Sequence, residues 1–457
     1  MQSSEEEKEI KSKFCERCYY LITNFTNEES FLDRIKLLEL TSNPHCNFCF
    51  GIFNLDNYKE IISTVKAQIR EIDHKDYKIS FNFSAIFDII HHYWRTMFAN
   101  SKHVKNPKEL DISMIRVVFK QIFLSVLEKG IHESFNPQSD TEVELSFEFS
   151  QSVYDDFNNM FKYLNKDVKL IPNDTIKAAV NMKKVISSLP GGLIKEIFKK
   201  FGFNDLASRN KDYAILVKNV KLIKDSLFLK GNYLKLTREI GQTKWQINGM
   251  RVCSSSVEEE IKKNLIKIFE CDDCVMSAGG REDRDVRMLG NGRPFILEII
   301  NPKKNITDHE YLTKEINKSG LVKVNTLSVS EKNYFEEIKK YETSKMKYYS
   351  CFVWCKKVLS DEDINNIKNV KNMNVIQKTP FRVLHRRTLM DRAKVIYKMD
   401  ATKINDHFLI VNILASAGTY IKEFVHSDLG RTKPSLVSLL NSECDILQLD
   451  VLDLILV

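Results

Sequence analysis

Apolar residues recur along the first half of the chain with two different spacings. Between Met114 and Glu128 they fall close to 3.6 residues apart, which predicts a helix with one buried face. Between Glu142 and Phe149 they alternate with polar residues, which predicts a strand. The two glycines after Pro190 interrupt the periodic pattern and indicate a break between elements.

The second half of the chain carries clearer signals for where elements begin and turn. Ser256 and Glu259 have the spacing of a capping box, and the apolar positions that follow predict a helix to about Glu270. The glycines at Gly290 and Gly292 lie between two apolar segments and predict a hairpin turn. Residues 445–457 have the pattern of a final strand. Helices mixed with non-alternating strands favour an α+β fold.

Length and composition bound the kind of protein. A chain of 457 residues is long enough for two or three domains, each with its own core. With 43% hydrophobic and 28% charged residues, collagen-like, coiled-coil and wholly disordered classes are excluded. The sequence has no apolar run of the roughly 18–20 residues that a membrane span needs, and its acidic first residues do not resemble a leader peptide. We therefore expect a soluble intracellular protein of the nucleus, the cytoplasm or both, and a monomer, since nothing requires an oligomer.

Four of the ten cysteines form two C-x2-C pairs, Cys15 with Cys18 and Cys46 with Cys49. Each pair can place two sulfurs on one side of a tight turn, and two such turns can close a tetrahedron around Zn2+. The alternative is four unrelated buried thiols, which would require two paired motifs to arise by chance. We expect a structural zinc ion, because four protein ligands leave no coordination position open for catalysis.

A further C-x2-C pair, Cys271 and Cys274, stands alone. It has no second pair nearby to complete a metal site. A redox or metal role is therefore only weakly indicated for it.

A segment rich in arginine, aspartate and glycine follows the helix predicted to end near Glu270. Asp283 and Asp285 lie among several arginines, beside two glycines. Glycine lets a backbone approach a ligand closely, and arginine binds phosphate through its planar fork. The loop could therefore face a phosphate-rich ligand, and a formal net charge of +8 permits a polyanionic partner. These residues alone leave a solvated charged hairpin open as the alternative.

This segment resembles the catalytic motif of pseudouridine synthases, most closely the archaeal and eukaryotic family that modifies uridines 54 and 55 in the T-arm of tRNA. The matching blocks stand in family order between about residues 226 and 457, and they include Gly280-Arg281-Glu282-Asp283, Lys378-Thr379-Pro380 with Arg386-Arg387, and Gly418-Thr419-Tyr420-Ile421-Lys422. The two cysteine pairs also resemble the family's N-terminal zinc motif. The resemblance implies a zinc module over residues 1–57, an RNA-binding accessory domain of the THUMP type over 58–225, and a catalytic domain over 226–457. It implies a mixed, largely antiparallel sheet with flanking helices for that last domain.

The resemblance also implies roles for single residues. Asp283 would be the nucleophile, attacking the uridine at the uracil ring or at the ribose, and no organic cofactor would be needed. Lys422 would be its basic partner, and Ile421 would line the uracil pocket. Tyr349 would stack on the target base; Tyr348 is its rival for that role, and packing in the core is the alternative for either.

Basic residues between Lys378 and Lys394 predict contact with a nucleic-acid backbone. By resemblance, Arg386, Arg387 and Arg281 would bind substrate, and a merely solvated basic face is the alternative. Arg284 departs from the family, which usually has a small aliphatic residue there. The expected partner is tRNA, through its T-arm and its acceptor end.

Two other functions compete with a tRNA pseudouridine synthase. A catalytically silent RNA-binding protein could be built on the same scaffold, although it would not need to keep Asp283, Lys422 and Tyr349 together. A THUMP-bearing methyltransferase would require a glycine-rich cofactor motif after a strand, and the sequence has none of convincing spacing.

Overall fold

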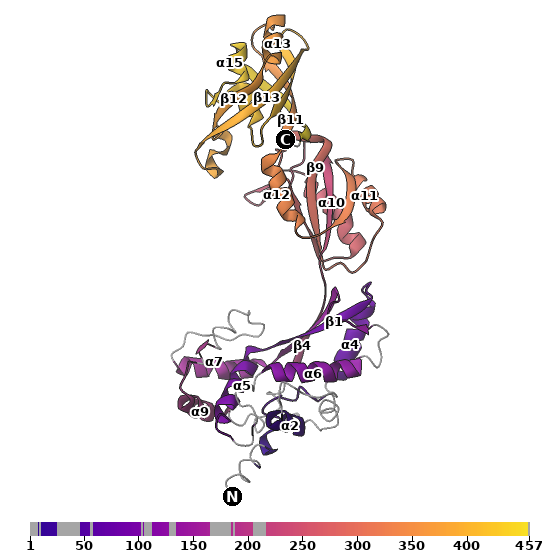
Figure 1. Ribbon diagram of the computed structural model, residues 1–457, viewed down its shortest axis with the longest axis vertical. Coiled ribbons are helices and arrows are strands. Elements are labelled where there is room, and N and C mark those ends of the chain that lie inside the picture. The colour runs from indigo at the N-terminus through magenta and orange to yellow at the C-terminus, as the bar shows by residue number, and fades with distance from the viewer. Residues whose placement is uncertain are drawn as a thin grey trace. The chain divides into compact units, whose positions relative to one another are not determined.

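The computed structural model describes residues 8, 11–24, 46–54, 58–101, 104, 112–127, 134–164, 184–185, 188–203 and 216–455. The chain divides into two compact units, Met1–Lys224 and Asp225–Val457 (Figure 1). Among the described helices, none combines the length and the apolar character that a membrane crossing needs.

The first unit packs helices against a four-stranded sheet. The described strands are β1 (Asp76–Phe83), β2 (Ser134–Phe135), β3 (Thr141–Glu148) and β4 (Leu216–Lys224), and the helices are α2 (Glu16–Asn24), α4 (Lys59–Arg70), α5 (Ala85–Met97), α6 (Ile112–Leu127), α7 (Gln151–Tyr163) and α9 (Gly191–Lys200). The strand order is β2-β1-β3-β4, with β1 parallel to both neighbours and β4 antiparallel to β3. The helix and strand predicted from periodicity are confirmed as α6 and β3. Fully buried phenylalanines such as Phe87, Phe119 and Phe147 fill the core.

The second unit is built on a ten-stranded sheet of order β10-β5-β9-β16-β11-β14-β13-β12-β15, with β8 paired to β9. Its strands are β5 (Leu227–Lys235), β8 (Asp273–Ala278), β9 (Val286–Ile300), β10 (Val322–Ser330), β11 (Met346–Cys355), β12 (Lys371–Lys378), β13 (Asp391–Lys403), β14 (Phe408–Ala415), β15 (Thr432–Lys433) and β16 (Cys444–Ile455). A separate short pair is formed by β6 (Gln246–Ile247) and β7 (Met250–Arg251). The helices are α10 (Val257–Phe269), α11 (His309–Asn317), α12 (Tyr334–Ser344), α13 (Asp361–Lys368), α14 (Ile421–His426) and α15 (Leu436–Leu440), with the 3-10 helix η6 (Phe381–Arg386).

Two hydrophobic cores lie along this sheet. One includes Leu265 of α10 and Leu297 of β9, and the other includes Val353 of β11 and Val411 of β14. Figure 1 shows α10, α11 and α12 around β9, and α13 and α15 beside β11 to β13. Strand β16 lies between β9 and β11 in the sheet. It therefore joins the strands that pack on the first of these cores to the strands that pack on the second.

The hairpin predicted at Gly290 and Gly292 is wrong, because these residues lie inside the long strand β9. The start of β9 pairs in parallel with β16, and its remainder pairs with β5 and β8. Both glycines have positive φ angles, 61° and 79°. A Cβ at Gly290 would lie 1.9 Å from the carbonyl oxygen of Leu452, and one at Gly292 would lie 2.7 Å from that of Tyr233. The glycines therefore let the strand bulge against its two neighbours instead of turning back.

The predicted helix after Ser256 is confirmed as α10. The Ser256 hydroxyl accepts a hydrogen bond from the backbone N–H of Glu259, and the helix ends at Glu270 in the left-handed conformation. The predicted final strand is confirmed as β16. These two elements carry their signals in local sequence, which is why they could be read without the tertiary structure.

Candidate active site and cysteine cluster

A cleft of about 660 Å3 lies where β9 meets β16, and Val286, Leu449 and Val451 of the paired segments line it. Its charged lining is mostly basic, comprising Arg281, Arg293, Lys347, Arg382, Arg387, Arg392, Lys394 and Lys422 against Glu282 and Asp283. A concave surface lined by one sign of charge raises the local concentration of ligands of the opposite sign. The cleft is therefore suited to a polyanion.

Asp283 lies in the loop between β8 and β9 and contacts two cations. Its Oδ2 is 3.0 Å from Nη1 of Arg382 and 3.4 Å from Nζ of Lys422. The side chain is 41% exposed, so the carboxylate is open to a ligand in the cleft. Two cations this close can orient the carboxylate, and a carboxylate in this position can act as a nucleophile.

Lys422 is shared between two carboxylates, and Asp285 is the nearer one. Its Nζ donates to both carboxylate oxygens of Asp285, at 2.8 and 2.7 Å. Burial raises the pKa of Asp285, but the hydrogen bonds and charge of Lys422 outweigh that effect and leave the pKa below its usual value. Lys422 is the second residue of helix α14, and its side chain lines the cleft.

Arg382 connects Asp283 to a second, buried acid. Its Nε donates to Oε1 of Glu423 at 2.7 Å, and the Glu423 side chain is 2% exposed. Burial lowers the pKa of Arg382, but the hydrogen bond and charge of Glu423 outweigh that effect, and the charge of Asp283 adds to the increase. The pKa of Arg382 therefore lies above its usual value. Arg382 is therefore held in place by a buried carboxylate while it contacts the exposed one.

Two cations from the end of β5 hold the backbone of the Asp283 loop. Lys235, fully buried, donates from Nζ to the carbonyl oxygens of Asp283 at 3.0 Å, Arg284 at 2.7 Å and Ile240 at 2.9 Å. Arg238 donates from Nη1 to the carbonyl oxygen of Asp285 at 3.0 Å. Three consecutive carbonyls around the candidate nucleophile are thus each bound to a positive charge.

A buried network supports the same loop through Glu282. Arg293 donates from Nε to Glu282 at 2.9 Å and from Nη1 to the carbonyl oxygen of Gly279 at 2.8 Å. The Tyr233 hydroxyl donates to Glu282, and Gln242 donates to that hydroxyl and to the carbonyl oxygen of Gly280. Glu282 and Arg293 side chains are each 1% exposed. Removing one partner of a buried ion pair typically costs about 3–5 kcal/mol, so the pair fixes the loop.

The candidate aromatic and apolar residues lie in the same cleft. Tyr349 of β11 is 7% exposed and lines the cleft, whereas Tyr348 is not among the lining residues. Burial raises the pKa of Tyr349 well above its usual value, so its hydroxyl stays protonated. Ile421, 3% exposed, lines the cleft one residue before Lys422. The structure therefore brings Tyr349, Ile421, Lys422 and Asp283 together.

The predicted basic contacts divide into three groups. Arg281 and Arg387 are exposed and line the cleft, and the half-buried Arg392 and Lys394 of the basic segment line it as well. Lys378 is exposed but lies outside the lining. The side chain of Arg386 lies outside the described residues.

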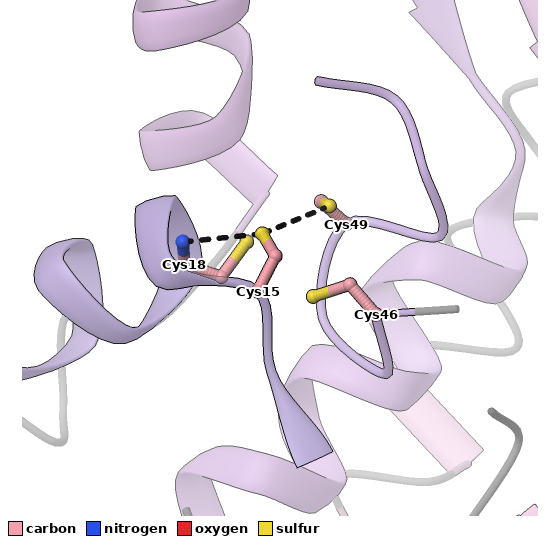
Figure 2. Close-up of side chains that lie close together, drawn as sticks. All are labelled: Cys15, Cys18, Cys46 and Cys49. Atoms are coloured by element: carbon pink, nitrogen blue, oxygen red, sulfur yellow. Dashed lines mark hydrogen bonds between the residues drawn. The ribbon is translucent and has the colours of Figure 1, made fainter. Parts of the chain in front are cut away.

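The four predicted metal ligands converge in the first unit (Figure 2). Their sulfur atoms all lie within 4.8 Å of one another, and all four residues are buried. Figure 2 shows Cys15 and Cys18 at the start of α2, facing the turn that carries Cys46 and Cys49. That turn is fixed to α5, where His91 Nε2 lies 3.0 Å from the carbonyl oxygen of Phe48 and Trp94 donates to that of Asn47 at 3.1 Å.

The cysteine cluster fits a tetrahedral metal ion. Zinc–sulfur bonds of about 2.3 Å in a tetrahedron place sulfurs about 3.8 Å apart, and the Sγ atoms of Cys15 and Cys49 are 3.9 Å apart. Burial raises the pKa of Cys18 and Cys49. Hydrogen bonds with the other three cysteines, that with Cys18 first, lower the pKa of Cys15. A cation among the sulfurs would offset the cost of charging the two thiols whose pKa burial raises. The cluster can therefore bind a metal through sulfur ligands alone.

Sequence reasoning missed several residues of this site. Arg382 was counted only as part of a basic segment, yet it is the nearest cation to Asp283. Glu423, which holds Arg382, was not singled out. Lys235 and Arg238 hold the loop backbone through contacts across about 50 residues of chain, which no local pattern indicates.

Comparison with known proteins places this site in a class. The family model for the C-terminal region of Pus10 matches residues 228–454. The tRNA pseudouridine synthase Pus10 of Homo sapiens is 32% identical over 422 residues, covering 89% of this chain and 77% of that protein. The protein of the same name from Methanocaldococcus jannaschii is 39% identical over 239 residues, covering 50% of this chain and 52% of that protein. Among solved structures, a Cbf5-Nop10-Gar1 complex covers 48% of this chain and 56% of its own at 15% identity, with a TM-score of 0.25, too low to decide a fold.

These matches define the chain as a pseudouridine synthase, which is an isomerase. The family predicted from the catalytic motif is thereby confirmed. The chain belongs to the Pus10 family.

Proposed function

We propose that this protein isomerises uridine to pseudouridine in the T-arm of tRNA, at position 54, position 55 or both. Asp283 attacks the uridine at the uracil ring or at the ribose. The bond between N1 and C1′ breaks, the uracil turns, and C5 bonds to C1′. The bond to Asp283 then breaks and restores the carboxylate, C5 loses its hydrogen as a proton and N1 gains a proton. Atoms and charge therefore balance without an oxidant, a reductant or an organic cofactor.

The observation that carries this proposal is the setting of Asp283. It is an accessible carboxylate, 3.0 Å from Arg382 and 3.4 Å from Lys422, in a cleft with a basic lining. The curated relatives that match most of this chain are named tRNA pseudouridine synthases, which supports tRNA as the substrate. The T-arm follows from the family resemblance of the catalytic motif.

The remaining cleft residues have roles that follow from their chemistry. Tyr349 offers a ring on which an unstacked uracil can pack, and such stacking is worth about 1–3 kcal/mol per base. Ile421 provides apolar surface beside it. Lys422 orients Asp283, and Arg281, Arg386 and Arg387 bind the RNA backbone. A base must leave its stack to reach this cleft, at a cost of a few kcal/mol that the stacking offsets.

For the first unit we infer two functions. The cluster of Cys15, Cys18, Cys46 and Cys49 holds a structural zinc ion, because four sulfur ligands satisfy a tetrahedral ion and leave no open position. The rest of the unit is an RNA-binding accessory domain of the THUMP type, which contacts the acceptor end of the tRNA. The packing of the cysteine turn against α5 supports the idea that the metal stabilises this domain.

The test uses unmodified tRNA transcript and purified protein without added cofactor. Pseudouridine is mapped by carbodiimide-blocked primer extension, with wild type, Asp283→Asn and Asp285→Asn side by side. We expect a T-arm signal that is lost in Asp283→Asn. It should be weakened but present in Asp285→Asn, which keeps the nucleophile and loses only a partner of Lys422.

Three outcomes would change the proposal. Signal at another position would keep the chemistry and overturn the T-arm assignment. Equal signal from wild type and Asp283→Asn would remove Asp283 as the nucleophile. Tight tRNA binding without pseudouridine in any transcript would favour a non-catalytic RNA-binding protein on the same scaffold.

A further inference from the structure

A strained turn follows helix α14. Ser427, Asp428, Leu429 and Gly430 have φ angles of 68°, 48°, 58° and 81°, so four consecutive residues are in the left-handed region. Residues with a Cβ atom avoid this region because the Cβ comes close to the following carbonyl oxygen. Those that do adopt it are normally single residues and not several in succession. Such strain persists only where the surrounding structure enforces it, and it often marks a functional element.

The side chain at the tip of the turn gains nothing from the fold. Leu429 is 90% exposed, the highest exposure among the large apolar side chains that the structure describes. A strained backbone that buries its leucine would be explained by packing, but this one presents the leucine to solvent. Packing within the described part of the chain therefore does not explain why the leucine stands at this position.

Hydrogen bonds tie this turn to the other exposed apolar residues nearby. The buried carboxylate of Asp428 accepts from the backbone N–H of Phe381 at 3.2 Å. Arg431 donates from Nη2 to the carbonyl oxygen of Thr379 at 2.7 Å. The Thr379 N–H in turn donates to the carbonyl oxygen of Met390. The side chains of Phe381, Leu389, Met390 and Leu429 are 64%, 73%, 53% and 90% exposed, and we call these four residues the apolar rim.

The apolar rim is attached directly to the catalytic cleft. Phe381 precedes Arg382, whose guanidinium lies 3.0 Å from Asp283. The strained turn follows the short helix α14, which begins with the cleft residues Ile421 and Lys422. Positive charge in the cleft attracts the RNA backbone, and exposed apolar side chains beside such a site suit bases that have left their stack.

We propose that the turn Ser427–Gly430 presents Leu429, together with Phe381, as an apolar contact for an unstacked base of the substrate RNA beside the cleft. The inference rests on the proposed function, because the occupant is the RNA that this cleft modifies. The backbone strain holds Leu429 away from the protein surface, where it cannot fold back onto its own neighbours. Contact with a base removes the leucine side chain from water when the RNA binds.

The test variant is Leu429→Gly, which removes the side chain and at the same time suits the left-handed backbone. We expect it to unfold at a temperature equal to or above that of wild type, yet to form pseudouridine roughly 10-fold more slowly at subsaturating tRNA, as loss of one apolar base contact implies. Phe381→Ala should show the same loss of rate. The matched control is Glu270→Gly, another left-handed position (φ 47°) at the end of α10, which should keep its rate.

RNA affinity measured in an Asp283→Asn background separates this inference from the proposed function. Weaker binding of tRNA by the Leu429→Gly form of that background supports the RNA contact even if the chemistry proves different. Unchanged affinity and unchanged rate would overturn the proposal, and would direct attention to a protein partner for the apolar rim. A drop in rate in Glu270→Gly equal to that in Leu429→Gly would also overturn it, because the effect would then reflect backbone flexibility.

Discussion

Replacement of Lys235 by methionine tests how the candidate nucleophile is held. Lys235 is fully buried, and its ammonium group donates to three carbonyl oxygens, two of them on the loop that carries Asp283. Methionine keeps the length and apolar stem of the side chain but donates no hydrogen bond. The loop would then lose its attachment at Asp283 and Arg284, while the cleft lining would keep every side chain.

Two opposing contributions set the expected effect on stability. Three carbonyls that lose their donor cost about 1–3 kcal/mol each. Burial, partly offset by the charge of Glu282, lowers the pKa of Lys235 from 10.5 to about 8. Holding that charge inside the fold therefore costs about 3 kcal/mol, which methionine relieves. We expect a net loss of about 3 kcal/mol in the free energy of unfolding.

The expected effect on catalysis is much larger. A shift of the nucleophile by about 1 Å can cost about 100-fold in rate, so Lys235→Met should lower the single-turnover rate by roughly that factor. Affinity for tRNA should stay within about twofold, because Lys235 does not line the cleft. The assay is release of tritium from C5-labelled uridine, with Lys230→Met in the same strand as the control.

The pH dependence separates positioning from simple stability. Because the pKa of Lys235 is about 8 in the fold, its third donor is lost as the pH rises through 8, and the wild-type rate should fall there. Over the same range the unfolded lysine still binds its proton, so the free energy of unfolding should rise from pH 8 towards 10.5. The carboxylates of Glu282, Asp283 and Asp285 and the thiol of Cys253 also act on Lys235.

Equal rates for Lys235→Met and wild type would refute the reasoning. So would a Lys235→Met variant that keeps the same decline above pH 8. Either result would mean that Arg238 and the Glu282 network position the loop without help from Lys235.

Two further predictions concern the aromatic and metal sites. Tyr349→Phe should keep its rate within about threefold because it keeps the ring, whereas Tyr349→Leu should react roughly 10-fold more slowly, in line with about 1–3 kcal/mol of stacking. Single-turnover rates of both variants measure this difference. Equal rates for the two variants would remove the stacking role. Cys46→Ser, or treatment with a strong chelator, should release one equivalent of zinc and lower the melting temperature of the first unit but not of the second, since structural zinc contributes about 10–16 kcal/mol of apparent binding energy. Elemental analysis measures the zinc and calorimetry measures the melting. Metal-free wild type that melts normally would contradict the zinc site.

Elements with local signals could be predicted from the sequence. The hydroxyl of Ser256 and the apolar spacing after it mark α10, and the two C-x2-C pairs mark the cysteine cluster. The catalytic motif was recognisable by resemblance, and the structure brings Asp283, Tyr349, Ile421 and Lys422 into one cleft. Their assigned roles remain predictions.

Features that depend on distant backbone could not be predicted. Gly290 has the local appearance of a turn, and only the carbonyl oxygen of Leu452 beside it shows that glycine is needed inside a strand. The partners of Lys422 and Arg382 follow from how the loop, η6 and α14 meet, which no spacing in the sequence reveals. The boundary predicted near residue 57 stays a prediction, while the core of the first unit includes both Cys49 and residues of α5 such as Phe87.

The position of β16 in the sheet has a consequence for how the chain folds during its synthesis. Every other element of the cleft leaves the ribosome before it, yet β16 is the strand through which β9 is connected to β11. Until it inserts, the loop of Asp283 and the helix of Lys422 belong to two separate pieces of sheet. A nascent chain therefore completes the candidate site only when β16 inserts, and we expect a chain that ends before residue 449 to lack this site.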